Sequence, residues 1–105
     1  MTESQYQGQL IKKLKRTFPG CMVLKNDPQY LQGILDLTVL YQHMWAMLEV
    51  KAGASAPFQP NQEYYIEHLG QMSFAAVIYP EIEEDVLSAL QEAFASRRTT
   101  RVSQS

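Results

Sequence analysis

The chain has 105 residues, 46% of them hydrophobic, and a formal charge of −2 from 9 Lys and Arg against 11 Asp and Glu. This length and composition suit a single domain with a small core, and the one cysteine, Cys21, excludes an intrachain disulfide framework and a multi-cysteine zinc site. No run approaches the roughly 18 apolar residues of a membrane helix and no signal-like segment opens the chain, so we expect a cytoplasmic protein without a membrane span.

The first predicted element is a helix over residues 2–17. Thr2 and Gln5 have the spacing of a capping box, and Pro19 and Gly20 end the helical pattern. Apolar side chains recur along it at steps of three and four, which indicates one buried face: Tyr6, Leu10, Ile11, Leu14 and Phe18.

Three predicted strands follow. Residues 21–25 form a short β-like run that the turn-forming residues 26–28 close. Residues 35–41 and 44–51 are rich in branched and aromatic side chains, and the two residues between them are short enough for a hairpin turn.

The second half of the chain predicts a loop, a helix, a strand and a helix. Residues 52–59 form the loop, and residues 62–71 the helix after Pro60. Residues 73–79 are apolar enough for a strand buried on both faces, and residues 81–95 carry acids in the first turn of a last helix. Residues 96–105 read as a flexible polar tail.

The element order is therefore αβββαβα, within one domain over residues 1–95. A mixed four-stranded sheet flanked by helices is the economical packing for this order, so we expect an α/β fold. The sequence contains no internal repeat.

The residues that carry chemistry lie where the middle strands end. Glu49 and Lys51 point to the same face because strand side chains alternate. Asp36 and Glu49 are equally far from the turn at Gln42 and His43, so antiparallel pairing places them opposite each other. Two facing carboxylates repel unless a cation lies between them, and carboxylate oxygens completed by water and phosphate are what Mg²⁺ prefers. Singly, Glu49 and Lys51 also fit a solvated ion pair, and Asp36 a strand-start residue.

These motifs resemble a known family. Residues 32–37 (QGILDL), 48–51 (LEVK) and 61–62 (NQ) are similar to the G-x-x-D, E-x-K and Q motifs of the VRR-NUC branch of the PD-(D/E)XK nucleases, above all to its small stand-alone phage-type members. Nearly the whole chain is covered, and the family's restriction-endonuclease-like core has the same αβββαβ order. Leu35 stands where the family usually has proline.

The resemblance implies a role for each matching residue. Asp36 and Glu49 would bind Mg²⁺, with Mn²⁺ as a substitute, and the Val50 carbonyl would be a further ligand. Lys51 would act on the attacking water, and Gln62 would support the active site. The resemblance also matches Glu3, in the first helix, to an acid offered to the metal.

DNA is the partner that the resemblance implies, and a homodimer acting on branched or junction DNA is the expected form. The charge balance is a weak argument against DNA, because residues 1–80 contain as many acidic as basic residues. Four basic residues of the first helix are candidates for phosphate contacts: Lys12, Lys13, Lys15 and Arg16.

Other interpretations remain open. A catalytically silent nuclease fold that binds DNA or protein is one alternative, and a soluble α/β domain with an unrelated partner is another. Trp45, Phe58, Tyr64 and Tyr65 suit either base stacking or packing, and packing is favoured. His43 and His68 lack a spaced partner for a zinc site and are expected at the surface.

Overall fold

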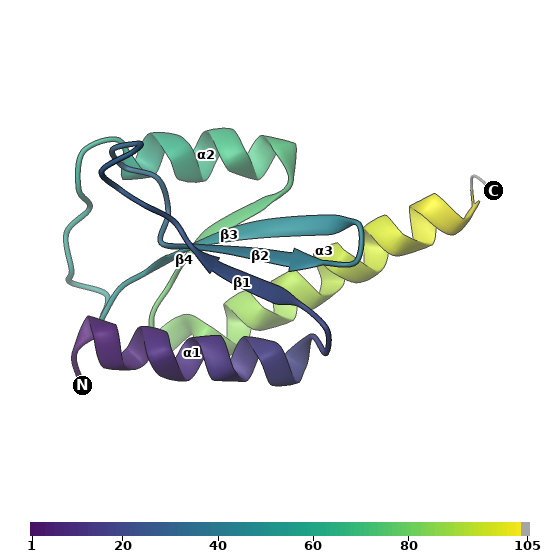
Figure 1. Cartoon of the computed structure of the whole chain (residues 1–105), viewed down its shortest axis with the longest axis horizontal. Helices are drawn as coiled ribbons and strands as arrows, with labels where there is room; N and C mark the ends of the chain where they lie inside the picture. Colours follow the sequence, from purple (N-terminus) through teal and green to yellow (C-terminus); the bar gives the residue numbers. More distant parts are fainter. Residues whose placement is uncertain (104–105) are drawn as a thin grey trace.

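The computed structural model (Figure 1) describes the backbone of residues 1–103 and the side chains of residues 1–96. It has the predicted αβββαβα order, with one short 3₁₀ helix added before the last α-helix. The elements are α1 (Glu3–Thr17), β1 (Met22–Lys25), β2 (Leu37–Tyr41), β3 (Met44–Val50), α2 (Gln62–Met72), β4 (Phe74–Ile78), η1 (Pro80–Ile82) and α3 (Glu83–Ser103).

The sheet is mixed and four-stranded, in the order β1-β2-β3-β4. The first three strands are antiparallel neighbours, whereas β4 runs parallel to β3 because α2 provides the crossover between them. The β2–β3 register pairs Leu37 with Leu48 and Tyr41 with Met44. This register confirms the predicted turn at Gln42 and His43, and it brings Asp36 opposite Glu49.

Helices cover both faces of the sheet, with α1 and α3 on one side and α2 on the other (Figure 1). Thr2 caps α1 through the predicted capping box with Gln5. The core lies between the sheet and the first and last helices, where the following side chains are buried: Tyr6, Leu10, Leu14, Phe18, Leu37, Val39, Leu48, Val50, Leu87, Leu90 and Phe94.

The chain differs from its sequence-based description at β4 and α3. We expected β4 to be buried on both faces, but its residues are half-buried up to Ile78 because β4 is an edge strand. The last helix begins at Glu83, after η1, and its backbone continues to Ser103. The tail expected at residues 96–105 thus falls mostly on residues whose side chains lie outside the described part. No helix in the described part is long and apolar enough to cross a membrane.

Candidate active site

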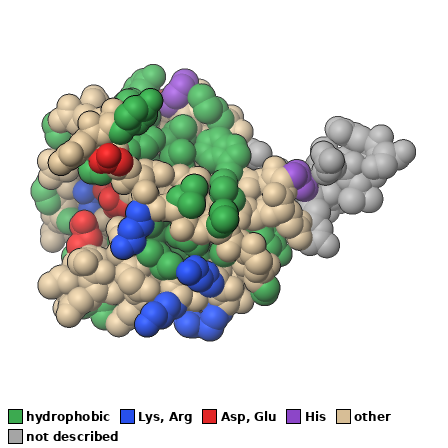
Figure 2. All heavy atoms as spheres, in the orientation of Figure 1, with side chains coloured by type: hydrophobic (Ala, Val, Ile, Leu, Met, Phe, Trp, Pro, Cys, Tyr) green, Lys and Arg blue, Asp and Glu red, His purple; other side chains and the backbone are tan. Residues whose placement is uncertain are grey.

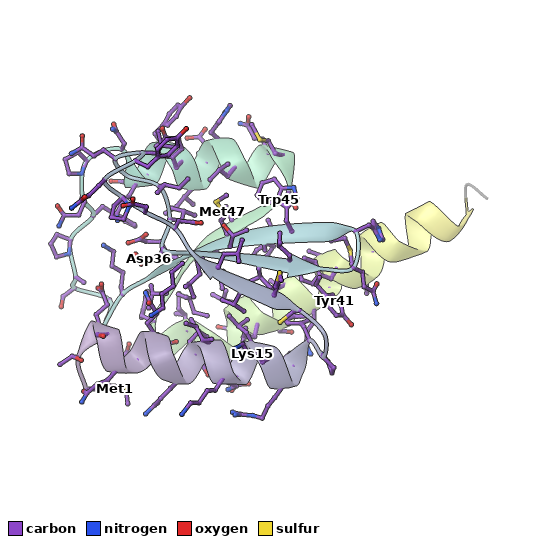
Figure 3. The ribbon with its side chains drawn as sticks, viewed as in Figure 1. Met1, Lys15, Asp36, Tyr41, Trp45 and Met47 are labelled. Carbon is purple, nitrogen blue, oxygen red and sulfur yellow. The ribbon has the colours of Figure 1, made fainter. Side chains whose placement is uncertain are left out.

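Asp36 lies at the end of the sheet where β2 begins and β3 ends (Figure 3). Its Oδ2 accepts a hydrogen bond from the backbone N–H of Val50 at 2.8 Å. The last regular pair between β2 and β3 is Leu37 with Leu48. Beyond this pair, the Asp36 carboxylate takes the place of a main-chain acceptor. Because the N–H and C=O of one strand residue point to the same side, the Val50 carbonyl also projects towards Asp36.

Glu49, Lys51 and Gln62 form a buried triangle beside Asp36. Their residues are 2%, 5% and 7% exposed, respectively. Gln62 Nε2 donates to Glu49 Oε2 at 2.6 Å, and Gln62 Oε1 accepts from Lys51 Nζ at 3.0 Å. Lys51 Nζ also lies 3.3 Å from Glu49 Oε2. This burial contradicts the reading of Glu49 and Lys51 as a solvated ion pair.

Lys51 also orders the loop that follows β3. Its Nζ donates to the Pro57 carbonyl at 2.9 Å, and it lies 5.5 Å from the centroid of the Phe58 ring. Gln62 Oε1 accepts a further hydrogen bond from the backbone N–H of Gln59 at 2.7 Å. The loop of residues 51–61, which contains the loop predicted at residues 52–59, is therefore tied to the site by the lysine and the glutamine.

The pKa values of both carboxyl groups are raised. Burial, followed by the negative charge of Asp36, raises the pKa of Glu49 from 4.5 to about 7. Burial is also the main cause of a raised pKa at Asp36, and the hydrogen bond from Val50 opposes it. Glu49 Oε1 is buried without a hydrogen-bond partner among the described residues. A divalent cation would bind the unpartnered carboxylate oxygen and would offset the repulsion between the two carboxylates.

The donor set fits a magnesium ion. Oδ2 of Asp36 and Oε2 of Glu49 accept hydrogen bonds from the protein, whereas Oε1 of Glu49 has no hydrogen-bond partner among the described residues. The Val50 carbonyl would offer a further oxygen, and waters or a substrate phosphate would supply the remaining ligands that Mg²⁺ prefers. The structure does not bring Glu3 into this group. It is exposed in α1, and the described residues contain no cluster of three His, Cys, Asp or Glu side chains that could hold a metal.

Two residues that support Asp36 were missed by the sequence analysis. Asn26 donates from its backbone to the Asp36 carbonyl at 2.9 Å and from Nδ2 to the Leu35 carbonyl at 2.8 Å. The hydroxyl of Thr38 donates to Asn26 Oδ1 at 2.9 Å. The main chain is thereby held on both sides of the aspartate. The signal available in the sequence was Thr38, a hydroxyl residue within an otherwise apolar predicted strand.

The backbone of Gly33 packs against the loop that precedes α2. Gly33 has a φ of +89°, and a Cβ built on it would lie 2.5 Å from Asn61 Cβ and 2.6 Å from the Pro60 carbonyl oxygen. The segment before β2 therefore packs directly against the segment before α2. Because Asn61 precedes Gln62, this contact sets the distance between the Asp36 strand and the glutamine.

The predicted DNA-contacting cluster on α1 is divided. Lys13 forms salt bridges with α3, where its Nζ lies 2.6 Å from Glu83 Oε2 and 3.0 Å from Glu84 Oε1. Lys12, Lys15 and Arg16 are exposed. Figure 2 shows Lys and Arg side chains along the lower edge of the molecule, over α1. His43 and His68 are exposed, as expected.

Comparisons of the chain with protein-family models, with curated proteins and with solved structures returned no match. What the site can do chemically therefore follows from its own residues and distances. A buried and a half-buried carboxylate, a backbone carbonyl and an ammonium group at one end of a sheet suit metal-assisted hydrolysis of a phosphate ester.

Proposed function

We propose that this chain is a Mg²⁺-dependent endonuclease that hydrolyses phosphodiester bonds in DNA. The observation that carries the proposal is the buried carboxylate of Glu49 beside the half-buried Asp36. Its oxygen Oε1 has no hydrogen-bond partner among the described residues, and Lys51 lies in the same site. A buried carboxylate with a purely structural role would be expected to have both of its oxygens hydrogen-bonded. The resemblance of the motifs to the VRR-NUC nucleases supports the same reaction.

Each residue of the candidate site would have a separate role in the reaction. Asp36 and Glu49 would hold Mg²⁺ with the Val50 carbonyl. When bound, the ion would polarise the phosphate and acidify a water. Lys51 would orient the attacking water and stabilise the negative charge that develops on the phosphate. Gln62 keeps Lys51 and Glu49 in fixed relative positions, because its amide contacts both.

The exposed basic residues of α1 support DNA as the partner. Lys12, Lys15 and Arg16 remain available for phosphate contacts, whereas Lys13 does not. The family resemblance extends the proposal to a homodimer that acts on branched DNA, and Mn²⁺ would substitute for Mg²⁺.

The test is cleavage of labelled linear, nicked and four-way-junction DNA with Mg²⁺ or Mn²⁺. We expect metal-dependent products from the wild type and at least about 100-fold less from Lys51→Ala. Lys25→Ala, which removes an exposed lysine of β1, is the matched control and should cut normally. A folded wild type that yields no product on any substrate, but binds DNA in the presence of a chelator, would instead support the catalytically silent binding module.

A further inference from the structure

Lys51, the amine of the candidate site, is enclosed by oxygen atoms. Its Nζ donates to the Pro57 carbonyl at 2.9 Å and to Gln62 Oε1 at 3.0 Å. It also lies 3.3 Å from Glu49 Oε2. An ammonium group carries three N–H donors, so these three oxygens match its donors in number. A water or phosphate oxygen can therefore accept a hydrogen bond from Lys51 only if one of them leaves.

Of these three acceptors, the Pro57 carbonyl can leave without disturbing the rest of the site. Gln62 belongs to α2 and Glu49 to β3, and the two side chains are joined by a hydrogen bond of 2.6 Å. Pro57 is exposed and lies in the loop between β3 and α2. Its departure would keep the contacts among Glu49, Lys51 and Gln62.

Residues 52–58, which we call the strap, are anchored at both ends. At the start, the backbone N–H of Lys51 donates to the Ile78 carbonyl at 3.0 Å. At the far end, the backbone N–H of Gln59 donates to Gln62 Oε1 at 2.7 Å. Every residue of the strap is exposed or half-buried, and none belongs to the core cluster of the described residues. Figure 1 shows the loop that contains it running along the outside of the molecule, from the end of β3 to α2.

The strap contacts Lys51 in two ways. The Pro57 carbonyl accepts its hydrogen bond, and the centroid of the Phe58 ring lies 5.5 Å from Nζ. The hydrogen bond from the Ala56 N–H to the Gly53 carbonyl, at 3.2 Å, is internal to the strap and can move with it. A Cβ built on Gly53 would meet nothing within 4 Å, so the backbone has room to turn there. A segment with so few buried contacts opens at a small cost in free energy.

A phosphate oxygen would replace the Pro57 carbonyl favourably. An anionic oxygen accepts a hydrogen bond from an ammonium group more strongly than a neutral carbonyl does. The contacts with Gln62 and Glu49 would hold Nζ in place while the exchange occurs. The amine would thus be ready to act on the substrate as soon as the strap moved.

We propose that the strap keeps Lys51 in a resting state, in which the Pro57 carbonyl oxygen occupies the position that a phosphate oxygen of the substrate takes in the reaction. Substrate binding displaces the strap, and the contact of Phe58 with the ammonium group sets how readily the strap opens. The choice of a phosphate oxygen rests on the proposed function, but closure of the strap over Lys51 does not depend on catalysis.

Acylation of lysine amines in EDTA tests closure of the strap without DNA. The protein is treated with the N-hydroxysuccinimide ester of acetic acid, and peptide mass spectrometry compares Lys51 with the exposed Lys25 in the same sample. We expect Lys51 to react about tenfold more slowly than Lys25, or slower still. Phe58→Leu removes the ring and should raise the rate at Lys51 by about 3- to 30-fold, whereas Phe58→Tyr should not.

Lys13, which is paired with two acids of α3, reports on the fold in the same samples. Its rate should be equal in the wild type and in both Phe58 variants. A wild type in which Lys51 reacts as fast as Lys25, or a Phe58→Leu variant that leaves Lys51 as protected as before, would overturn the proposal. An increase that Lys13 shares would also overturn it, because the whole fold would then have loosened.

A longer strap tests displacement by the substrate. Insertion of two glycines after Gly53 leaves both anchors in place but makes closure less favourable. We expect faster acylation of Lys51 and a kcat/KM for cleavage of DNA with Mg²⁺ that equals or exceeds the wild-type value. Ser55→Ala, which changes an exposed strap residue without changing the length, should match the wild type in both measurements.

A longer strap that exposes Lys51 but lowers kcat/KM would show that the Pro57 carbonyl belongs to the working site, and would overturn the proposal. The two measurements also separate this proposal from the nuclease. If the wild type cut no DNA but Phe58→Leu still exposed Lys51, only the nuclease would be refuted. If the wild type cut DNA while Lys51 reacted as freely as Lys25, only the strap would be refuted.

Discussion

The backbone N–H of Val50 donates to Asp36 Oδ2 at 2.8 Å, so the aspartate is fixed to the last residue of the neighbouring strand. One oxygen of the Asp36 carboxylate is thereby used to hold the end of β3. A single hydrogen bond between Asp36, the residue before β2, and the last residue of β3 thus links two of the three proposed metal-binding residues.

Asp36→Asn separates the structural use of Asp36 from its charge. The amide oxygen of the variant can still accept from Val50, so the fold should be retained, whereas an anionic metal ligand is lost. We expect metal-dependent cleavage to fall by more than about 100-fold and the Mg²⁺-induced rise in Tm to disappear. Asp27→Asn, at an exposed acid of the adjoining loop, should do neither. A variant that cut DNA normally would remove Asp36 from the active site.

Glu49 should make the metal-free protein less stable as pH rises. Its pKa is about 7 in the folded chain against an ordinary value of 4.5, so between these values the folded state binds more protons than the unfolded state. Stability is therefore highest below about pH 4.5 in this respect and is lost as pH rises through about 7, by roughly 3 kcal/mol. The raised pKa of Asp36 acts in the same direction.

Glu49→Gln should reduce this pH dependence. In EDTA we expect its Tm to exceed that of the wild type at pH 8 and to approach it at pH 4.5. Mg²⁺ should raise the Tm of the wild type at pH 8 but not that of the variant. Thermal unfolding of Glu67→Gln, at an exposed acid of α2, provides the control. If Glu49→Gln lost stability with pH as steeply as the wild type, burial of the Glu49 charge would not be the cause.

The sequence predicted the parts of the site that depend on local spacing. The length of the hairpin at Gln42 was enough to place Asp36 opposite Glu49, because antiparallel register follows from the turn. The hydrogen bonds from Asn26 to Leu35 and from Thr38 to Asn26 were not predicted, since they depend on the register between β1 and β2. Strand order likewise requires tertiary contacts, and this is why the edge position of β4 was missed.

The Thr38 hydroxyl should matter to metal binding through Asn26. Thr38→Val keeps the shape of the side chain but leaves Asn26 Oδ1 without its donor. The Asn26 side chain is then less firmly oriented, which weakens its hydrogen bond to the Leu35 carbonyl. We expect Mn²⁺ affinity, measured by calorimetry, to fall by about tenfold, as for other groups that orient metal ligands. Thr38→Ser retains the hydroxyl and should bind Mn²⁺ nearly as the wild type does. A general loss of stability would affect both variants alike and would argue against this positioning role.

Gly33 and Gly20 form a natural pair for testing how the two loops of the site are held together. Their φ angles are +89° and +88°, so alanine at either position is strained by about 1 kcal/mol or more. A Cβ at Gly20 meets nothing within 4 Å, whereas one at Gly33 would lie 2.5 Å from Asn61 Cβ. Gly33→Ala must therefore push the segment before α2 away from β2.

We expect urea unfolding to show that Gly33→Ala loses about 1–3 kcal/mol more stability than Gly20→Ala. The displaced Asn61 would also carry Gln62 away from Glu49 and Lys51, so cleavage should fall in Gly33→Ala and remain near wild type in Gly20→Ala. Equal losses of stability would mean that backbone strain alone explains the glycine. A normal cleavage rate in a destabilised Gly33→Ala would mean that the contact with Asn61 supports the fold without positioning the glutamine.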